Sequence, residues 1–136
     1  MSGSLRLAIR TEIDATRAAL EATRYSRDAG HEETSSRLIA TAVSELARNI
    51  LKYAGRGEIQ LRQVGRRVQH RSAHGIEIVA VDRGPGIADP ETAMRDHFSS
   101  GGTLGLGLPG VKRMMDEFSL DSTPGEGTRV TAVKWL

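Results

Sequence analysis

Cysteine is absent from this 136-residue chain, which excludes a disulfide framework, a thiolate metal site and a cysteine nucleophile. Aromatic residues make up only 4% and the formal net charge is only +2, which argues against a nucleic-acid-binding surface. No apolar run approaches the roughly 18 residues of a membrane span, and the N-terminal MSGSLRLAIRTEIDATR is too polar for a secretory signal. We therefore expect a cytoplasmic protein that binds neither nucleic acid nor membranes.

The hydrophobic content and the length of the chain suit a domain with one hydrophobic core. The hydrophobic fraction is 38%, and the length is typical of a single domain over residues 1–136. Hydrophobic periodicity and turn residues predict strands at 5–9, 58–64, 75–82, 118–122 and 128–135, and helices at 14–29, 32–53 and 108–117, with a turn over 65–73 and a short helix over 90–95. This order predicts an α+β two-layer sandwich, with helices on one face of a mixed, mostly antiparallel sheet.

The most unusual stretch is GGTLGLGLPGVKRMMDEF, residues 101–118. Gly105, Gly107 and Gly110 have the spacing G-x-G-x-x-G and lead into a predicted helix, whose first backbone amides suit a phosphate. No Lys-Ser or Lys-Thr follows the glycines, which excludes a Walker A loop. No predicted strand leads into them, which argues against a Rossmann site. Taken alone, the pattern leaves a purely structural turn equally open.

Two further motifs carry polar groups suited to a nucleotide. In DRGPGI, Asp82 ends an apolar strand, and Gly84 and Gly86 permit a tight turn and close approach to a flat ligand. In ELARN, Glu45 and Asn49 are spaced i and i+4 on one side of a predicted helix. Such a pair can activate a hydroxyl and hold Mg²⁺. A strand-end turn and a solvated helix edge are the simpler readings of these two motifs.

The order of these motifs resembles that of the GHKL, or Bergerat-fold, ATPase superfamily. The resemblance implies that ATP and Mg²⁺ bind here, with Glu45 as the catalytic residue and Asn49 as the metal ligand. It implies that Asp82 accepts a hydrogen bond from the adenine amino group. The implied nucleotide-binding residues are Asn49, Asp82, Gly84, Gly86, Gly105, Leu106, Gly107, Leu108, Gly110 and Thr128.

The segments IATAVSELARNILKYAGRGEI, DRGPGI and GLGLPGVKRMMDEF are similar to those of the RsbT-type switch serine/threonine kinases, in the anti-sigma-factor kinase branch. This implies an ATP-dependent kinase of bacterial stress signalling that phosphorylates STAS-domain, stressosome-type proteins. It also implies a second partner, a PP2C-type phosphatase or its regulatory domain, which the released kinase activates. A homodimer is compatible with this family and is left open.

Other interpretations remain at this point. The alternative function is an anti-sigma factor that sequesters a sigma factor and phosphorylates an anti-anti-sigma factor. A sensor histidine kinase would need a dimerisation domain for which the chain has no room. Residues 88–104 are a candidate lid, and the γ-phosphate could be neutralised by Arg48, Lys52, Arg95 or Lys112. The basic segment LRQVGRRVQHR is expected to form a solvated hairpin or a docking patch for an acidic partner.

Overall fold

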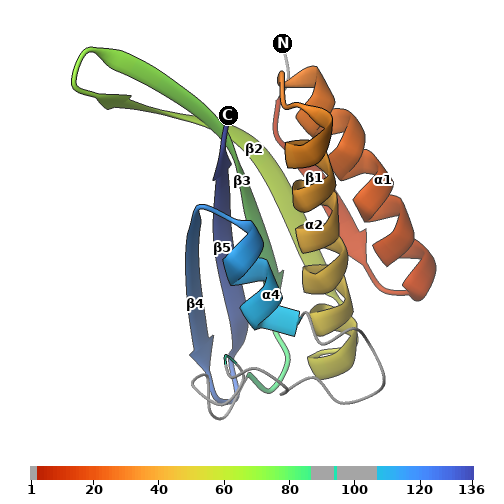
Figure 1. Cartoon of the computed structure of the whole chain (residues 1–136). Coiled ribbons are helices and arrows are strands. Elements are labelled where there is room, and N and C mark those ends of the chain that lie inside the picture. The colour runs from red at the N-terminus through yellow and green to blue at the C-terminus, as the bar shows by residue number, and fades with distance from the viewer. Residues whose placement is uncertain (1–2, 87–93, 95–106) are drawn as a thin grey trace.

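The computed structural model describes residues 3–86, 94 and 107–136. Five strands form one sheet in the order β1-β2-β3-β5-β4, and each neighbouring pair is antiparallel. The strands are β1 (Leu5–Ile9), β2 (Gly57–Val68), β3 (Arg71–Asp82), β4 (Glu117–Thr123) and β5 (Gly127–Trp135). The helices α1 (Glu12–Asp28), α2 (Glu33–Tyr53) and α4 (Gly107–Met114) lie on one face of the sheet (Figure 1). The predicted α+β two-layer class is confirmed.

The core lies between the helices and the sheet. Helix α2 buries an apolar stripe formed by Ile39, Val43, Leu46 and Ile50, each at most 2% exposed. Alternating strand residues such as Ile59 and Ile78 meet this stripe from the sheet. Small alanine side chains on α1 are buried too, which lets α1 approach α2 closely: Ala15, Ala18 and Ala22. Helix α2 is therefore the central helix.

Helix α1 begins two residues earlier than predicted because Thr11 caps it. The Thr11 hydroxyl accepts a hydrogen bond from the Asp14 N–H, and the Asp14 carboxylate accepts one from the Thr11 N–H, at 3.2 and 3.1 Å. At the other end Gly30 has φ +97°, which terminates the helix.

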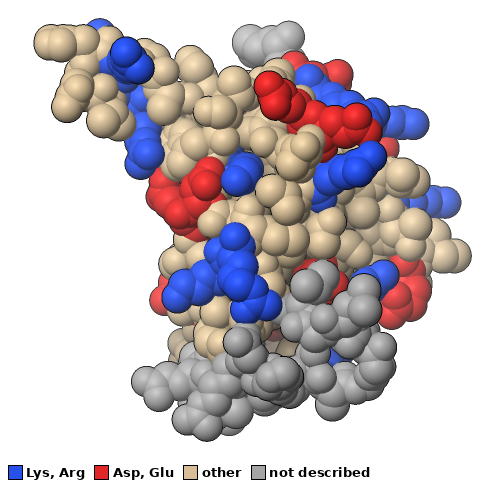
Figure 2. All heavy atoms as spheres, viewed as in Figure 1, with Lys and Arg blue, Asp and Glu red and all other residues tan. Residues whose placement is uncertain are grey.

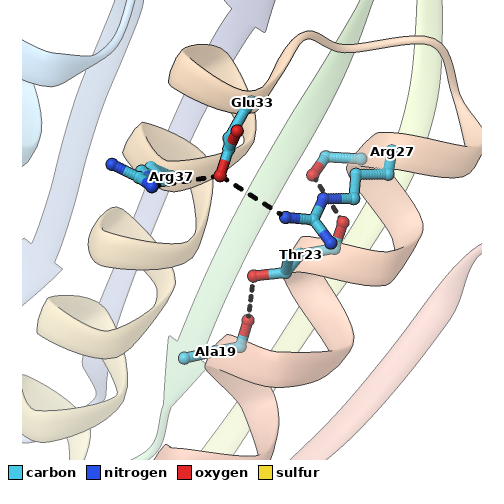
Figure 3. A network of polar contacts seen from close by, with 6 residues as sticks. Ala19, Thr23, Arg27, Glu33 and Arg37 are labelled. Atoms are coloured by element: carbon cyan, nitrogen blue, oxygen red, sulfur yellow. Dashed lines mark hydrogen bonds and ion pairs between the residues drawn. The ribbon is translucent and has the colours of Figure 1, made fainter.

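Polar contacts on the surface join the two long helices (Figure 3). The Glu33 carboxylate of α2 accepts a hydrogen bond from Arg37 at 3.0 Å and lies 4.0 Å from Arg27 of α1. On α1, the Thr23 hydroxyl donates to the carbonyl oxygen of Ala19 at 3.1 Å. Exposed ion pairs contribute little stability, so apolar packing holds the two helices together.

Three further predicted boundaries are wrong, at the end of β2, the start of β3 and the end of α4. Strands β2 and β3 continue to Val68 and Arg71, leaving only Gln69 and His70 in a tight turn where a turn over 65–73 was predicted. Gln69 has φ +58°, which such a two-residue turn requires. Helix α4 ends at Met114 because the Asp116 N–H donates to Val133 of β5 at 2.8 Å. The predicted helix at 90–95 and the candidate lid at 88–104 fall outside the described residues, Met94 excepted.

Candidate functional site

The carboxylate of Asp82 is held in place at the end of β3. One of its oxygens accepts a hydrogen bond from the Gly84 N–H at 3.0 Å. The other oxygen has no partner among the residues that the structure describes. The side chain is half-buried, so this free oxygen is available to a hydrogen-bond donor on a ligand.

The glycines that follow Asp82 approach other parts of the protein closely. A Cβ added to Gly84 would lie 2.5 Å from the Cβ of Ala54, at the end of α2. A Cβ added to Gly86 would lie 2.6 Å from the carbonyl oxygen of Thr123, and Gly86 also has φ +79°. The two glycines therefore let this loop fit between α2 and the β4–β5 turn. The sequence had suggested ligand approach as their reason, whereas the structure gives both a packing partner within the chain.

Helix α2 supplies an unsatisfied polar group at the same end of the sheet. The side-chain nitrogen of Asn49 is buried and has no hydrogen-bond partner among the residues that the structure describes. An unpaired buried donor costs about 1–3 kcal/mol, so a ligand that accepts from it recovers that energy. One turn earlier, the side chain of Glu45 is 13% exposed, and its carboxylate lies 3.7 Å from the Arg48 guanidinium.

A small cavity brings the predicted residues of three elements together. Asn49 of α2, Asp82 of β3 and Thr128 of β5 line it, together with Leu108 of α4. Glu45 does not line this cavity. The volume of the cavity is about 20 Å³, which is room for about one water molecule. Ligand pockets usually measure roughly 300–1,000 Å³, so this cavity corresponds to only a small part of a nucleotide site.

The position of Thr128 follows from strand pairing. Thr128 lies opposite Asp82 in the β3–β5 register. Its hydroxyl is 3.0 Å from the hydroxyl of Ser122 on β4, which also donates to the Gly127 carbonyl at 3.3 Å. Ser122 was not singled out from the sequence, and only the β4–β5 register reveals its place. Tyr53 also lines the cavity and was not among the predicted site residues, although its place four residues after Asn49, on the same side of α2, could have indicated it.

The glycine-rich segment is described only in part. Gly107 has φ +48° and begins α4, while Leu108 and Gly110 are buried. Gly105 and Leu106 lie outside the described residues. Helix α4 carries no acidic residue in its first turn, so nothing there opposes an anion at its N-terminus.

The basic residues considered for the γ-phosphate are in different surroundings. Arg48 is beside Glu45, and the Lys52 ammonium lies 5.3 Å from the centre of the Tyr53 ring. Lys112 is exposed on α4, where Lys and Arg side chains gather in Figure 2. Arg95 falls outside the described residues. Among the described residues, no three His, Asp or Glu side chains form a metal-binding group, and no helix is long and apolar enough to span a membrane.

Comparison with known proteins identifies the family. Residues 9–134 match the model of the histidine kinase-like ATPase domain. The serine/threonine-protein kinase RsbT of Bacillus subtilis (strain 168) is 48% identical over 128 residues, which are 94% of this chain and 93% of RsbT. The chain belongs to the RsbT-type kinases of the histidine kinase-like ATPase family.

More distant relatives of this RsbT-type chain are anti-sigma F factors. Those of Thermoanaerobacter sp. (strain X514) and of Caldanaerobacter subterraneus subsp. tengcongensis are each 33% identical over 101 residues, which are 72% of this chain and 68% of each relative. The RsbT-type chain is therefore a protein kinase of a partner-switching system, and its domain type implies the use of ATP.

Proposed function

We propose that this protein is a switch kinase of bacterial stress signalling. It phosphorylates a serine or threonine of STAS-domain, stressosome-type proteins, and after release it activates a PP2C-type phosphatase. The 48% identity to RsbT over nearly the whole of both chains supports this proposal. The observation that carries it is the convergence of Asn49, Asp82 and Thr128 on one cavity. We also propose a single domain over residues 1–136, acting in the cytoplasm, where ATP is supplied.

The residues at the cavity fit an adenine nucleotide. In this proposal the free oxygen of Asp82 accepts a hydrogen bond from the adenine amino group, and Thr128 lies across from it. The unpaired side-chain nitrogen of Asn49 suits a phosphate oxygen. Rotating that amide by half a turn presents its oxygen instead, which is the atom that Mg²⁺ requires. The amides around 105–107 and the start of α4 complete the phosphate site.

Glu45 is the proposed catalytic residue. Bound ATP and Mg²⁺ supply the phosphoryl group and neutralise its charge during transfer. The Glu45 carboxylate, one helical turn before Asn49, orients the acceptor hydroxyl and takes its proton. Arg48, 3.7 Å away, holds the carboxylate on this side of α2. Such general-base help usually contributes about 10²–10⁴-fold in rate.

The second candidate function is an anti-sigma factor. The 33% identity to anti-sigma F factors favours it, and the same pocket would serve both functions. The two functions differ in their partners. Sequestration predicts a stable complex with a sigma factor, whereas a switch kinase predicts no such complex.

Calorimetric titration with Mg-ATP, and with NADH as a control ligand, tests the nucleotide site. We expect ATP binding that is lost in Asp82→Asn, because an amide presents a donor to the adenine amino group at this position. Asp121→Asn on the exposed part of β4 makes the same chemical change elsewhere and should bind like wild type. Equal binding by Asp82→Asn and wild type would contradict the site.

Single-turnover phosphorylation of a STAS-domain protein tests the catalytic residue. Glu45→Gln should bind ATP within about twofold of wild type yet transfer phosphate about 10²–10⁴-fold more slowly. Transfer at the wild-type rate would remove Glu45 from the mechanism without affecting the nucleotide site.

A further inference from the structure

Three arginines meet at one end of the sheet, on neighbouring strands. Strand pairing aligns three residues in one row across β1, β2 and β3: Ile9, Gly57 and Asp82. The residue just beyond this row is an arginine in each case: Arg10, Arg56 and Arg83. All three are exposed, and they lie at the end of the sheet where α2 ends (Figure 1).

These arginines border a hollow of about 500 Å³, here named the arginine hollow. Its wall includes Ala8, Glu58 and Val81, the next row inward. These residues alternate along their strands with Ile9, Ile59 and Ala80, which are buried toward the helices. This inner row of the hollow therefore lies on the face of the sheet opposite the helices, and Asp82 is the one described residue that borders both the hollow and the nucleotide cavity.

The arginine hollow carries an excess of positive charge, because the three arginines share its lining with only two carboxylates, Glu58 and Asp82. The side chains of Arg10, Arg56 and Arg83 have neither an ion pair nor a hydrogen bond within the described part of the chain. Glu58 is engaged by Arg6 at 3.9 Å, and the Asp82 carboxylate is held by the Gly84 N–H. Other arginines of this face are paired, such as Arg62 with Glu77 at 2.6 Å.

We propose that the arginine hollow is a docking site for an acidic segment of a protein partner. Guanidinium groups bind carboxylates through paired N–H donors, and three such groups around one hollow suit several carboxylates in sequence. The residues that line the hollow are exposed or half-buried, and none is buried, so the hollow suits a polypeptide segment that stays partly in solvent rather than an enclosed small molecule.

This proposal rests on the proposed kinase function, because a protein kinase has protein partners. The arginine hollow and the nucleotide cavity share only Asp82 among the described residues, and the three arginines do not line the nucleotide cavity, so an acidic segment can contact the arginines while a nucleotide is bound. An acidic segment bound here would hold a partner against the kinase without touching the reacting groups.

Fluorescence anisotropy with a labelled ten-residue glutamate peptide at 150 mM NaCl tests the site. We expect Arg56→Gln/Arg83→Gln to weaken binding about 3- to 30-fold, as two exposed ion pairs predict. The control Arg67→Gln/Arg71→Gln removes the same charge from the projecting β2–β3 hairpin (Figure 2), where both side chains are exposed, and should leave the affinity within about twofold. Equal weakening by both pairs, or no binding of the peptide, would refute the proposal.

Amide chemical shifts locate the peptide independently. Addition of the glutamate peptide should move the resonances of Gly57 and Arg83 and leave those of Gln69 and His70 at the hairpin turn unchanged. Shifts confined to the hairpin would overturn the assignment, as would preferential binding of a ten-nucleotide oligothymidylate to the same amides. Mg-ATP titration of the wild-type protein separates the two hypotheses, because absence of ATP binding together with normal peptide binding would refute the kinase function and not the arginine hollow.

Discussion

The close approach of Gly127 to Asp82 leads to a quantitative prediction about the nucleotide site. Gly127 begins β5 with φ +124°, and an added Cβ would overlap the carbonyl oxygen of Asp82 and lie 2.9 Å from the Cα of Arg83. Both of these are backbone atoms that cannot turn away as a flexible side chain can. Gly127→Ala therefore has to move β5 away from the end of β3, where Asp82 is held.

Gly125, two residues earlier, provides a matched control. It also has a positive φ, +82°, but nothing lies within 4 Å of an added Cβ. Gly125→Ala should cost only the backbone strain of a left-handed alanine, about 1–2 kcal/mol. Gly127→Ala adds overpacking of about 1–3 kcal/mol, for a total of about 2–5 kcal/mol.

Urea denaturation and Mg-ATP calorimetry on both variants measure these effects. With a slope of about 1–3 kcal/mol/M, the difference between the variants shifts the midpoint by about 1 M. Gly127→Ala should also bind ATP more weakly, because Asp82 and Thr128 are displaced, whereas Gly125→Ala should bind like wild type. Equal stability and equal affinity of the two variants would refute the steric argument.

Two further predictions concern α1 and the loop after it. Thr11→Ala removes the hydroxyl that caps α1 and should lower the free energy of unfolding by about 1 kcal/mol. In the control Thr16→Ala, the lost hydroxyl donates only to the Glu12 carbonyl at 3.3 Å, so the free energy of unfolding should change by less than about 0.5 kcal/mol. Burial and the nearby Lys134 lower the pKa of His31, although Asp116 opposes this. As the pH falls below about 6.5, the unfolded state therefore protonates His31 before the folded state does. The free energy of unfolding should therefore fall between pH 7.5 and 5.5, and urea denaturation should show a smaller fall in His31→Gln than in wild type or in the exposed control His74→Gln. An unchanged pH dependence in His31→Gln would assign the effect to other groups.

Much of the helical structure was readable from local patterns. The stripe of α2 repeats every three or four residues, so its buried face and its end near Tyr53 follow from periodicity alone. The start of α1 was missed because its capping box uses Asp14 in place of the usual Glu. The β2–β3 hairpin was misjudged because Gly65 and several arginines suggested a turn. Instead, Arg66 packs 4.3 Å from the Trp135 ring centre and pairs with Glu117 at 3.5 Å, contacts across the sheet that local propensity does not report.

The sequence by itself determined which polar residues are candidates for the functional site. Asp82 at a strand end and Asn49 on a helix are recognisable because their spacing from neighbouring glycines and apolar residues is local. Tertiary structure decided which of these residues meet. Antiparallel pairing of β3 with β5, far apart in the chain, placed Thr128 opposite Asp82, and the β4–β5 register added Ser122. The pairing of β1, β2 and β3 likewise aligned Arg10, Arg56 and Arg83 at one end of the sheet. Only the tertiary structure decides this alignment, because strand register follows from burial of one sheet face over the whole fold.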